Sequence, residues 1–203
     1  MKTPDKKVSG VILAAGSATR MGKTKQLLPF GKTTLLGQVI QNAKESQLHE
    51  IIVVLGHDAK IICKTLDLSG TLVIQNTDYL KGQSSSLIKG LEKVSPSCDA
   101  AMFLLGDQPL IKAHLINRLI KAFKTISPPI VIPYCEGKRG NPVIIARPLF
   151  QRLASLSQDT GARVIFDEHK STLLKLEVQD TAILMDVDTM EEYKTLLKMV
   201  THE

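Results

Sequence analysis

Apolar residues along the chain alternate between short continuous runs and longer stretches in which they recur at helical spacing. The continuous runs predict buried strands, because a strand covered on both faces carries apolar side chains on both. These predicted strands are Val8–Ala15, Ile51–Leu55, Thr71–Gln75 and Ala100–Leu105. The helical spacing predicts helices at Thr33–Ser46, Asp58–Leu66, Gln83–Val94 and Lys112–Thr125. In the second of these helices we expect both Ile61 and Ile62 to face inward.

Repeated strand–helix units of this size indicate an α/β fold with a mostly parallel sheet and helices on both faces. Parallel crossovers are right-handed, so the carboxyl ends of all these strands lie at one edge of the sheet. Ligands of open α/β sheets bind along that edge. We therefore look for functional residues just after each predicted strand.

The regular alternation of strands and helices ends after Ser127. Two strands joined by a polar loop, a short helix and a further strand are predicted at Ile130–Pro133, Pro142–Ala146, Gly161–Glu168 and Leu173–Val178. Thr189-Met-Glu-Glu192 has the pattern of a capping box and opens a last helix to about Met199. Neither a linker nor an internal repeat interrupts the pattern, so we predict one domain over residues 1–203.

Composition narrows the classes of partner. Hydrophobic residues make up 43% and charged residues 23%, as in ordinary globular proteins. The net charge of +6 favours an anionic partner, which leaves nucleic acid, a membrane surface or a small phosphorylated ligand. Aromatic residues make up only 4% and tryptophan is absent, so a nucleic-acid binder would have few side chains on which bases stack. We expect no nucleic-acid partner.

Two further classes are excluded by simple patterns. No apolar run approaches the roughly 18–20 residues that span a bilayer, and the apolar run after the basic N-terminus is interrupted at Gly16 and Arg20, too soon for a secretory signal. We expect a cytoplasmic protein without membrane contact. The three cysteines, Cys63, Cys98 and Cys135, are widely spaced, which indicates small core residues and no disulfide framework or zinc site.

A loop rich in small and basic residues follows the first predicted strand, from Leu13 to Lys25. Small residues let backbone N–H groups approach an anion closely. The loop is not a Walker A motif, because five residues separate Gly16 from Gly22 and Pro29 interrupts any helix that would follow. Arg20 and Lys25 are the cations that we expect to bind phosphate groups, and Lys23 is expected to face solvent.

At this loop the sequence Leu-Ala-Ala-Gly-x-x-x-Arg-Met-Gly-x-x-Lys-x-Leu-Leu resembles the signature of the molybdenum-cofactor nucleotidyltransferase family. Further elements match in the same order along the chain: Gly56–Ala59, Gly82–Leu87, Gly106–Pro109, Lys138–Val143, Asp159–Arg163 and Asp186–Thr189. Met190 departs from the pattern, since the family usually has proline after the closing Asp-x-Asp-Thr. The likeness spans most of the chain and is specific for the family, but much less so for the acceptor.

The resemblance implies a Rossmann-like fold, bound Mg²⁺ and a nucleoside triphosphate. Family members that join CMP to molybdopterin match most closely, so we expect transfer of CMP from CTP to that phosphate, with release of pyrophosphate. GTP or another phosphorylated acceptor, such as a sugar or alcohol phosphate, remains an alternative. So does a chaperone that carries the cofactor to a client molybdoenzyme. We expect residues 8–110 to bind the nucleotide and residues 111–203 to bind the acceptor.

The expected nucleotide site combines the first loop with the Gly-x-x-x-Ser-Leu element. Through the resemblance, its residues are Leu13, Ala14, Ala15, Gly16, Arg20, Lys25, Gly82, Ser85 and Ser86. Ala15 belongs to the Leu-Ala-Ala-Gly version of the loop, which resembles the cytidine type; the guanosine type more often has Leu-Ala-Gly-Gly. We expect Arg20, Lys25 and Asp107 to act directly in catalysis.

Two aspartates are the expected metal ligands. Asp107 follows the fourth predicted strand and Asp188 follows a late predicted strand, the short apolar segment Ala182–Val187, so one sheet edge would bring both to a single Mg²⁺. From the residues alone, Asp107-Gln-Pro is equally compatible with a turn that begins a helix. Asp186 is the alternative second ligand, since strand alternation would point it to the same side as Asp188.

The acceptor side is the least defined part of the expected site. Arg139, Asn141 and Arg163 lie in the two late motifs and could contact a phosphorylated acceptor. A hairpin turn explains Asn141 as well, and a surface ion pair explains Arg163.

Overall fold

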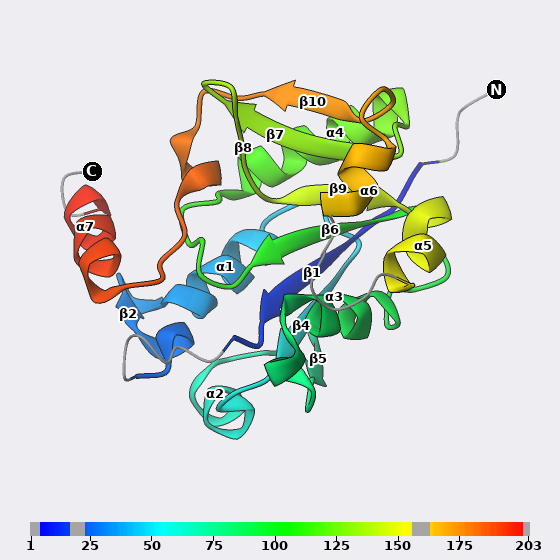
Figure 1. Ribbon diagram of the computed structural model, residues 1–203. Coiled ribbons are helices and arrows are strands. Elements are labelled where there is room, and N and C mark those ends of the chain that lie inside the picture. Colours follow the sequence, from blue (N-terminus) through cyan, green and yellow to red (C-terminus); the bar gives the residue numbers. More distant parts are fainter. Residues whose placement is uncertain (1–4, 17–22, 156–162, 201–203) are drawn as a thin grey trace.

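The computed structural model describes residues 5–16, 23–155 and 163–200 (Figure 1). Its strands are β1 (Val8–Ala14), β2 (Pro29–Phe30), β3 (Thr33–Thr34), β4 (Glu50–Leu55), β5 (Leu72–Gln75), β6 (Ala100–Leu105), β7 (Ile130–Cys135), β8 (Lys138–Arg139), β9 (Val143–Ala146) and β10 (Leu174–Glu177). The main sheet has the order β10-β7-β9-β6-β1-β4-β5, with β8 paired to β7. Within it, β9 runs antiparallel to both neighbours and β8 antiparallel to β7, and the other pairs are parallel. The mostly parallel α/β sheet is thus confirmed.

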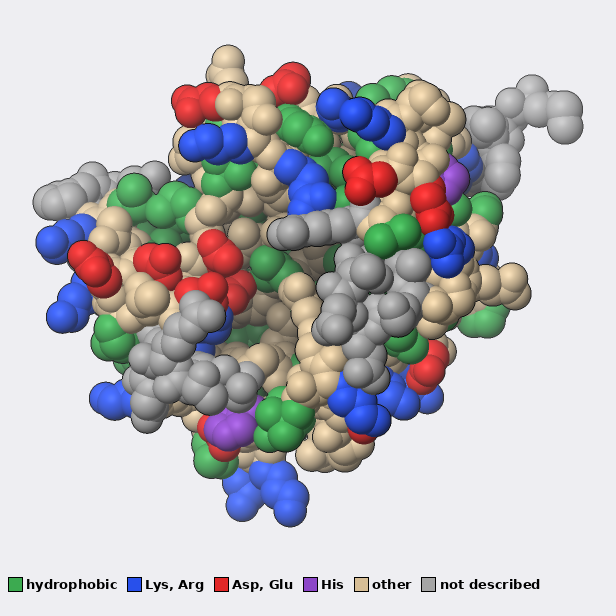
Figure 2. Space-filling model, in the orientation of Figure 1, with side chains coloured by type: hydrophobic (Ala, Val, Ile, Leu, Met, Phe, Trp, Pro, Cys, Tyr) green, Lys and Arg blue, Asp and Glu red, His purple; other side chains and the backbone are tan. Residues whose placement is uncertain are grey.

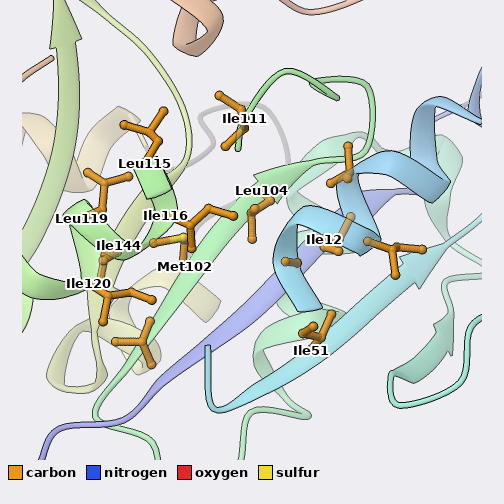
Figure 3. Close-up of a cluster of buried hydrophobic side chains, with 14 of the residues drawn as sticks. Ile12, Ile51, Met102, Leu104, Ile111, Leu115, Ile116, Leu119, Ile120 and Ile144 are labelled. Carbon is orange, nitrogen blue, oxygen red and sulfur yellow. The ribbon is translucent and has the colours of Figure 1, made fainter. Parts of the chain in front are cut away.

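Helices cover both faces of this sheet. They are α1 (Leu35–Lys44), α2 (Ala59–Thr65), α3 (Gln83–Leu91), α4 (Ala113–Ile126), α5 (Phe150–Ala154), α6 (Arg163–Glu168) and α7 (Met190–Val200). Short 3-10 turns occupy Lys25–Leu27, Tyr79–Lys81, Arg147–Leu149 and Thr181–Leu184. One apolar cluster joins the sheet to α1, α2 and α4, and a second joins its other face to α3, α5 and α6. Figure 3 shows the first cluster, in which Ile116 of α4 packs near Met102 of β6.

Helix α2 corrects two expectations. Ile62 is fully buried, but Ile61 is 52% exposed, so only one of the two isoleucines faces inward. Cys63 is exposed, whereas Cys98 and Cys135 are buried. The helix is short and meets the core only along the side that carries Ala59 and Ile62. Each residue turns roughly 100° from the last, so both neighbours of Ile62 point away from the core.

A small hairpin, β2–β3, was not predicted and has a structural role. With α7 it forms a third apolar cluster that includes Phe30, Val187 and Leu196. The Tyr193 hydroxyl of α7 donates a hydrogen bond of 2.6 Å to the Pro29 carbonyl. The hairpin and α7 therefore lie side by side (Figure 1). No helix in the described part of the chain is long and apolar enough to cross a bilayer.

Candidate active site

A cavity of about 520 Å³ opens where β1 and β6 end. Its walls come from three parts of the chain: Leu13, Ala14, Ala15, Gly16, Lys25 and Gln26; Tyr79, Leu80, Gly82, Gln83 and Ser86; and Leu105, Gly106, Asp107, Asp186 and Asp188. Figure 2 shows this face of the molecule hollowed near its centre, with acidic side chains gathered to the left of the hollow. The cavity lies at the carboxyl edge of the parallel strands, where the topology predicts a ligand site.

One lysine joins two carboxylates on the charged side of the cavity. Lys25 Nζ lies 2.6 Å from Asp107 Oδ2 and 2.9 Å from Asp188 Oδ1. Asp186 lines the same cavity. The reason expected for this was wrong, because Thr181–Leu184 is a 3-10 turn and residues 185–188 form no strand, so strand alternation does not orient Asp186. The structure thus brings together Lys25, Asp107, Asp186 and Asp188, which lie far apart in the sequence.

Burial and ion pairing shift the pKa values of Lys25 and Asp107. Burial acts to lower the pKa of Lys25, but the Asp107 and Asp188 carboxylates outweigh it, and the net pKa lies above the ordinary value. Burial raises the pKa of Asp107, and Lys25 only partly offsets this effect, while Asp186 and Asp188 add to it. Three carboxylates and one described ammonium thus line the cavity, so its described lining carries an excess of negative charge that favours a further cation.

The backbone at the end of β1 is held by a residue that sequence analysis passed over. Gln26 is 4% exposed, and its Nε2 donates to the carbonyls of Ala14 (3.0 Å) and Gly16 (3.1 Å). The loop after β6 also packs closely against the end of β1, since a Cβ on Gly106 would lie 2.8 Å from the Ala14 Cβ. Glycine at this position therefore lets the loop with Asp107 lie against the end of β1.

The opposite wall of the cavity is neutral. Gly82 has φ +97°, a backbone conformation that favours glycine, and it leads directly into α3. Asn76 is fully buried, and its Nδ2 donates to the hydroxyls of Ser85 and Ser86, both at 2.9 Å. Ser86 lines the cavity, but Ser85 is not among the described lining residues. The Ser85 hydroxyl instead donates to the Gly82 carbonyl at 2.8 Å, which fixes the turn.

A second overlooked side chain supports the loop after β6. Asn42 of α1 is 6% exposed and donates two hydrogen bonds of 2.9 Å, to the carbonyls of Pro109 and Ile111. Its Oδ1 accepts from Gln38 Nε2. The signal was present in the sequence, because Asn42 is a polar residue at a position that continues the apolar spacing of Leu35 and Val39.

The carboxylates fit a divalent cation. Asp107 Oδ1 is buried and has no hydrogen-bond partner, so this oxygen is free to bind a metal. Within the described ranges, no three His, Cys, Asp or Glu side chains form a cluster that could hold a metal alone. Mg²⁺ is usually held by one or two carboxylates together with substrate phosphates, so two aspartates are a sufficient protein contribution.

Other expected residues lie away from the cavity or outside the described part of the chain. Arg20 lies outside the described residues, as do the first four residues of the Asp159–Arg163 element. Arg163 begins α6, but its side chain is not described. The Arg139 guanidinium lies 4.9 Å from the Phe166 ring centroid. The Asn141 N–H donates to the Ile183 carbonyl at 3.0 Å, and neither Arg139 nor Asn141 lines the cavity.

Comparison with known proteins gives one family and several full-length relatives. The model of the MobA-like NTP transferase domain matches residues 10–173. Nicotine blue oxidoreductase of Paenarthrobacter nicotinovorans is 29% identical over 202 residues, which cover 94% of this chain and 96% of that protein. Molybdenum cofactor cytidylyltransferase of Escherichia coli K12 is 24% identical over 194 residues, which cover 94% of this chain and 96% of that protein.

A solved structure resembles almost the whole chain. Rv0371c of Mycobacterium tuberculosis H37Rv, in complex with manganese, superposes with a TM-score of 0.83 and 30% sequence identity, over 95% of this chain and 99% of that one. That relative therefore binds a divalent cation on the same fold.

Proposed function

Because the chain belongs to the MobA-like NTP transferase family and is therefore a nucleotidyltransferase, we propose that it transfers CMP from CTP to the terminal phosphate of molybdopterin. The observation that carries this proposal is the contact of Lys25 with both Asp107 and Asp188 at the carboxyl edge of the sheet. The full-length relative named molybdenum cofactor cytidylyltransferase supports the choice of acceptor.

The transfer is a substitution at the α-phosphorus. An oxygen of the acceptor phosphate forms the new P–O bond, the bond between the α- and β-phosphates breaks, and pyrophosphate leaves. Catalysis of this kind consists mainly of alignment and neutralisation of charge. Lys25 and Arg20 would bind the triphosphate, and Asp107 and Asp188 would hold Mg²⁺. When bound, Mg²⁺ supplies a positive charge to the phosphate oxygens.

The neutral wall is the proposed place for the nucleobase. Backbone groups of Leu13–Gly16 and Gly82, with the Ser86 hydroxyl, offer donors and acceptors for a pyrimidine edge. Ser85 would act there only through the turn that it stabilises. Ala15 supports CTP over GTP through the resemblance of its loop to the cytidine type.

The acceptor would bind beside residues of the second half of the chain. We assign the nucleotide to residues 8–110 and the acceptor to residues 111–203, with Arg139, Asn141 and Arg163 as proposed contacts. Arg139 would have to leave the Phe166 ring to reach a ligand, since the two are stacked. A client molybdoenzyme would then receive the finished cofactor.

The test incubates purified protein with Mg²⁺ and each nucleoside triphosphate, with and without molybdopterin. We expect pyrophosphate release that requires both CTP and molybdopterin. Release with GTP, or only with a sugar phosphate, would contradict the proposed substrates. Tight binding of molybdopterin without turnover would indicate a cofactor carrier. Redox conversion of nicotine blue without pyrophosphate release would indicate the activity that the name of the Paenarthrobacter relative describes.

A further inference from the structure

Lys25 is the only cation among the described residues that line the cavity. Its side chain is 14% exposed, and its Nζ contacts Asp107 and Asp188 at 2.6 and 2.9 Å. The position between the two carboxylates is therefore occupied by a cation of the chain itself.

The roles proposed for Lys25, Asp107 and Asp188 in the reaction are incompatible with the contacts that these three residues make in the structure. Asp107 and Asp188 would hold the metal ion, and Lys25 would bind the triphosphate. A Mg²⁺ ion lies about 2.0–2.1 Å from its oxygen ligands. An ammonium nitrogen that contacts the same two carboxylates at 2.6 and 2.9 Å occupies nearly the same space. Two cations this close also repel each other strongly in a partly buried site.

We propose that Lys25 substitutes for the divalent cation when the nucleotide is absent, and that it moves to the triphosphate when the metal binds. Lys25 keeps Asp107 and Asp188 together in the metal-free protein, since the three carboxylates of the cavity would otherwise repel one another. The triphosphate offers Lys25 a new anionic partner, which frees both aspartates. This inference rests on the proposed function for the identity of the ligands.

A binding linkage follows from the exchange. If the triphosphate draws Lys25 away from the carboxylates, the triphosphate strengthens metal binding, and the metal strengthens triphosphate binding by the same factor. Without nucleotide, the metal must displace an ion pair to bind, so its affinity is low. Lys25 thereby keeps the carboxylates from holding a metal until the nucleotide is present.

The test measures Mn²⁺ binding by calorimetry and by the electron paramagnetic resonance signal of free Mn²⁺, without turnover. We expect Lys25→Met to bind Mn²⁺ about tenfold more tightly than the wild type when nucleotide is absent. Added CTP should strengthen Mn²⁺ binding by the wild type, and this enhancement should shrink by about tenfold in Lys25→Met. Circular dichroism confirms that the variant is folded.

Lys23→Met is the matched control. Lys23 lies two residues away, is exposed and does not line the cavity, so its removal deletes the same charge without opening the carboxylate pair. We expect its Mn²⁺ affinity to stay within about twofold of the wild type. An increase equal to that of Lys25→Met would show that general charge, and not displacement, controls metal binding, and would overturn the proposal.

A crystal structure of the wild type with Mn²⁺ alone provides a second readout that needs no variant. We expect Mn²⁺ between Asp107 and Asp188, and Lys25 Nζ moved out of hydrogen-bonding distance of both carboxylates. An ammonium still bonded to both aspartates beside a bound ion would overturn the proposal. Neither measurement involves molybdopterin, so a failed transfer assay with intact metal–nucleotide coupling would refute the proposed function alone.

Discussion

The position of Asp107 is set both by a residue that contacts its side chain and by residues that contact only the loop around it. Lys25 contacts its Oδ2, whereas Asn42 stabilises the loop beyond it through the carbonyls of Pro109 and Ile111. Gly106 lets the same loop approach the end of β1. The sequence motif identified Asp107 itself, but not the polar side chains that fix its backbone.

Asp107→Asn should abolish nucleotidyl transfer, because an amide cannot supply the negative charge that a divalent cation requires. Pyrophosphate release measures the loss. Asp167→Asn is the control, since Asp167 is exposed on α6 and distant in sequence from every proposed ligand of the metal. Activity of Asp107→Asn at the level of this control would show that the metal assignment is wrong.

Asn42→Ala should lower the free energy of unfolding by about 1–3 kcal/mol, because two buried carbonyls lose their donor. Transfer should also slow, since the loop that carries Asp107 loses its support. Urea denaturation measures stability. Gln41→Ala removes an exposed neighbour whose side chain donates to Glu45, and should leave the unfolding midpoint nearly unchanged. An unchanged midpoint in Asn42→Ala would contradict the assigned role.

Helix α7 begins with the capping box that the sequence predicts. The Thr189 Oγ1 accepts from the Glu192 N–H at 3.2 Å, and Glu192 Oε2 accepts from the N–H groups of Asp188 and Thr189, both at 2.8 Å. The box thus stabilises the helix and also orients the backbone of Asp188. Its hydrogen bonds from the Asp188 and Thr189 backbone lower the pKa of Glu192.

Glu192→Gln should reduce stability at neutral pH and weaken metal binding through Asp188. A carboxyl with a lowered folded-state pKa stabilises the protein above its unfolded pKa, and this contribution is lost as the pH falls through the folded value. The stability difference between wild type and Glu192→Gln should therefore shrink as the pH falls below 4.5, the ordinary value. Thermal unfolding at several pH values measures this stability difference. A difference that does not change with pH would show that the ionisation of Glu192 is not its cause.

The periodic spacing of apolar residues predicted most of the helices and strands, because apolar residues recur on the face that each element buries. It did not identify β2–β3, whose strands have two residues each and are too short to show a pattern. It also placed Ile61 inward, since spacing alone cannot tell how wide the contact face of a short helix is. The cavity wall followed from family motifs, but Gln26 and Asn76 act through hydrogen bonds to the loops around it, which leave no periodic signal.

At the scale of the whole molecule, the third apolar cluster connects distant parts of the chain. It joins α7 to the β2–β3 hairpin, which lies just after Lys25. Asp188 precedes α7, so the position of this helix determines whether Asp188 reaches Lys25. The net charge of +6 is not concentrated in the cavity, since Lys25 is the one described cation among its lining residues.

Leu196→Ala should lower the free energy of unfolding by about 2–5 kcal/mol, because Leu196 is 2% exposed in the third cluster. It should also weaken metal binding, as α7 loosens from the hairpin. Chemical denaturation and Mn²⁺ titration measure the two effects. Met199→Ala, on the same helix but 50% exposed, should change neither by much. Equal losses in both variants would show that helix content, and not packing, is responsible.

The order in which the cavity residues occur along the chain affects protein synthesis. A ribosome releases Lys25 first, Asp107 after β6, and Asp188 only after all the strands of the sheet have emerged. A nascent chain therefore contains the loop proposed to bind phosphate well before it contains Asp107 and Asp188, the two proposed metal ligands. Since α7 must then dock on the hairpin, an incomplete chain lacks the complete cavity, even where its early strands have already folded.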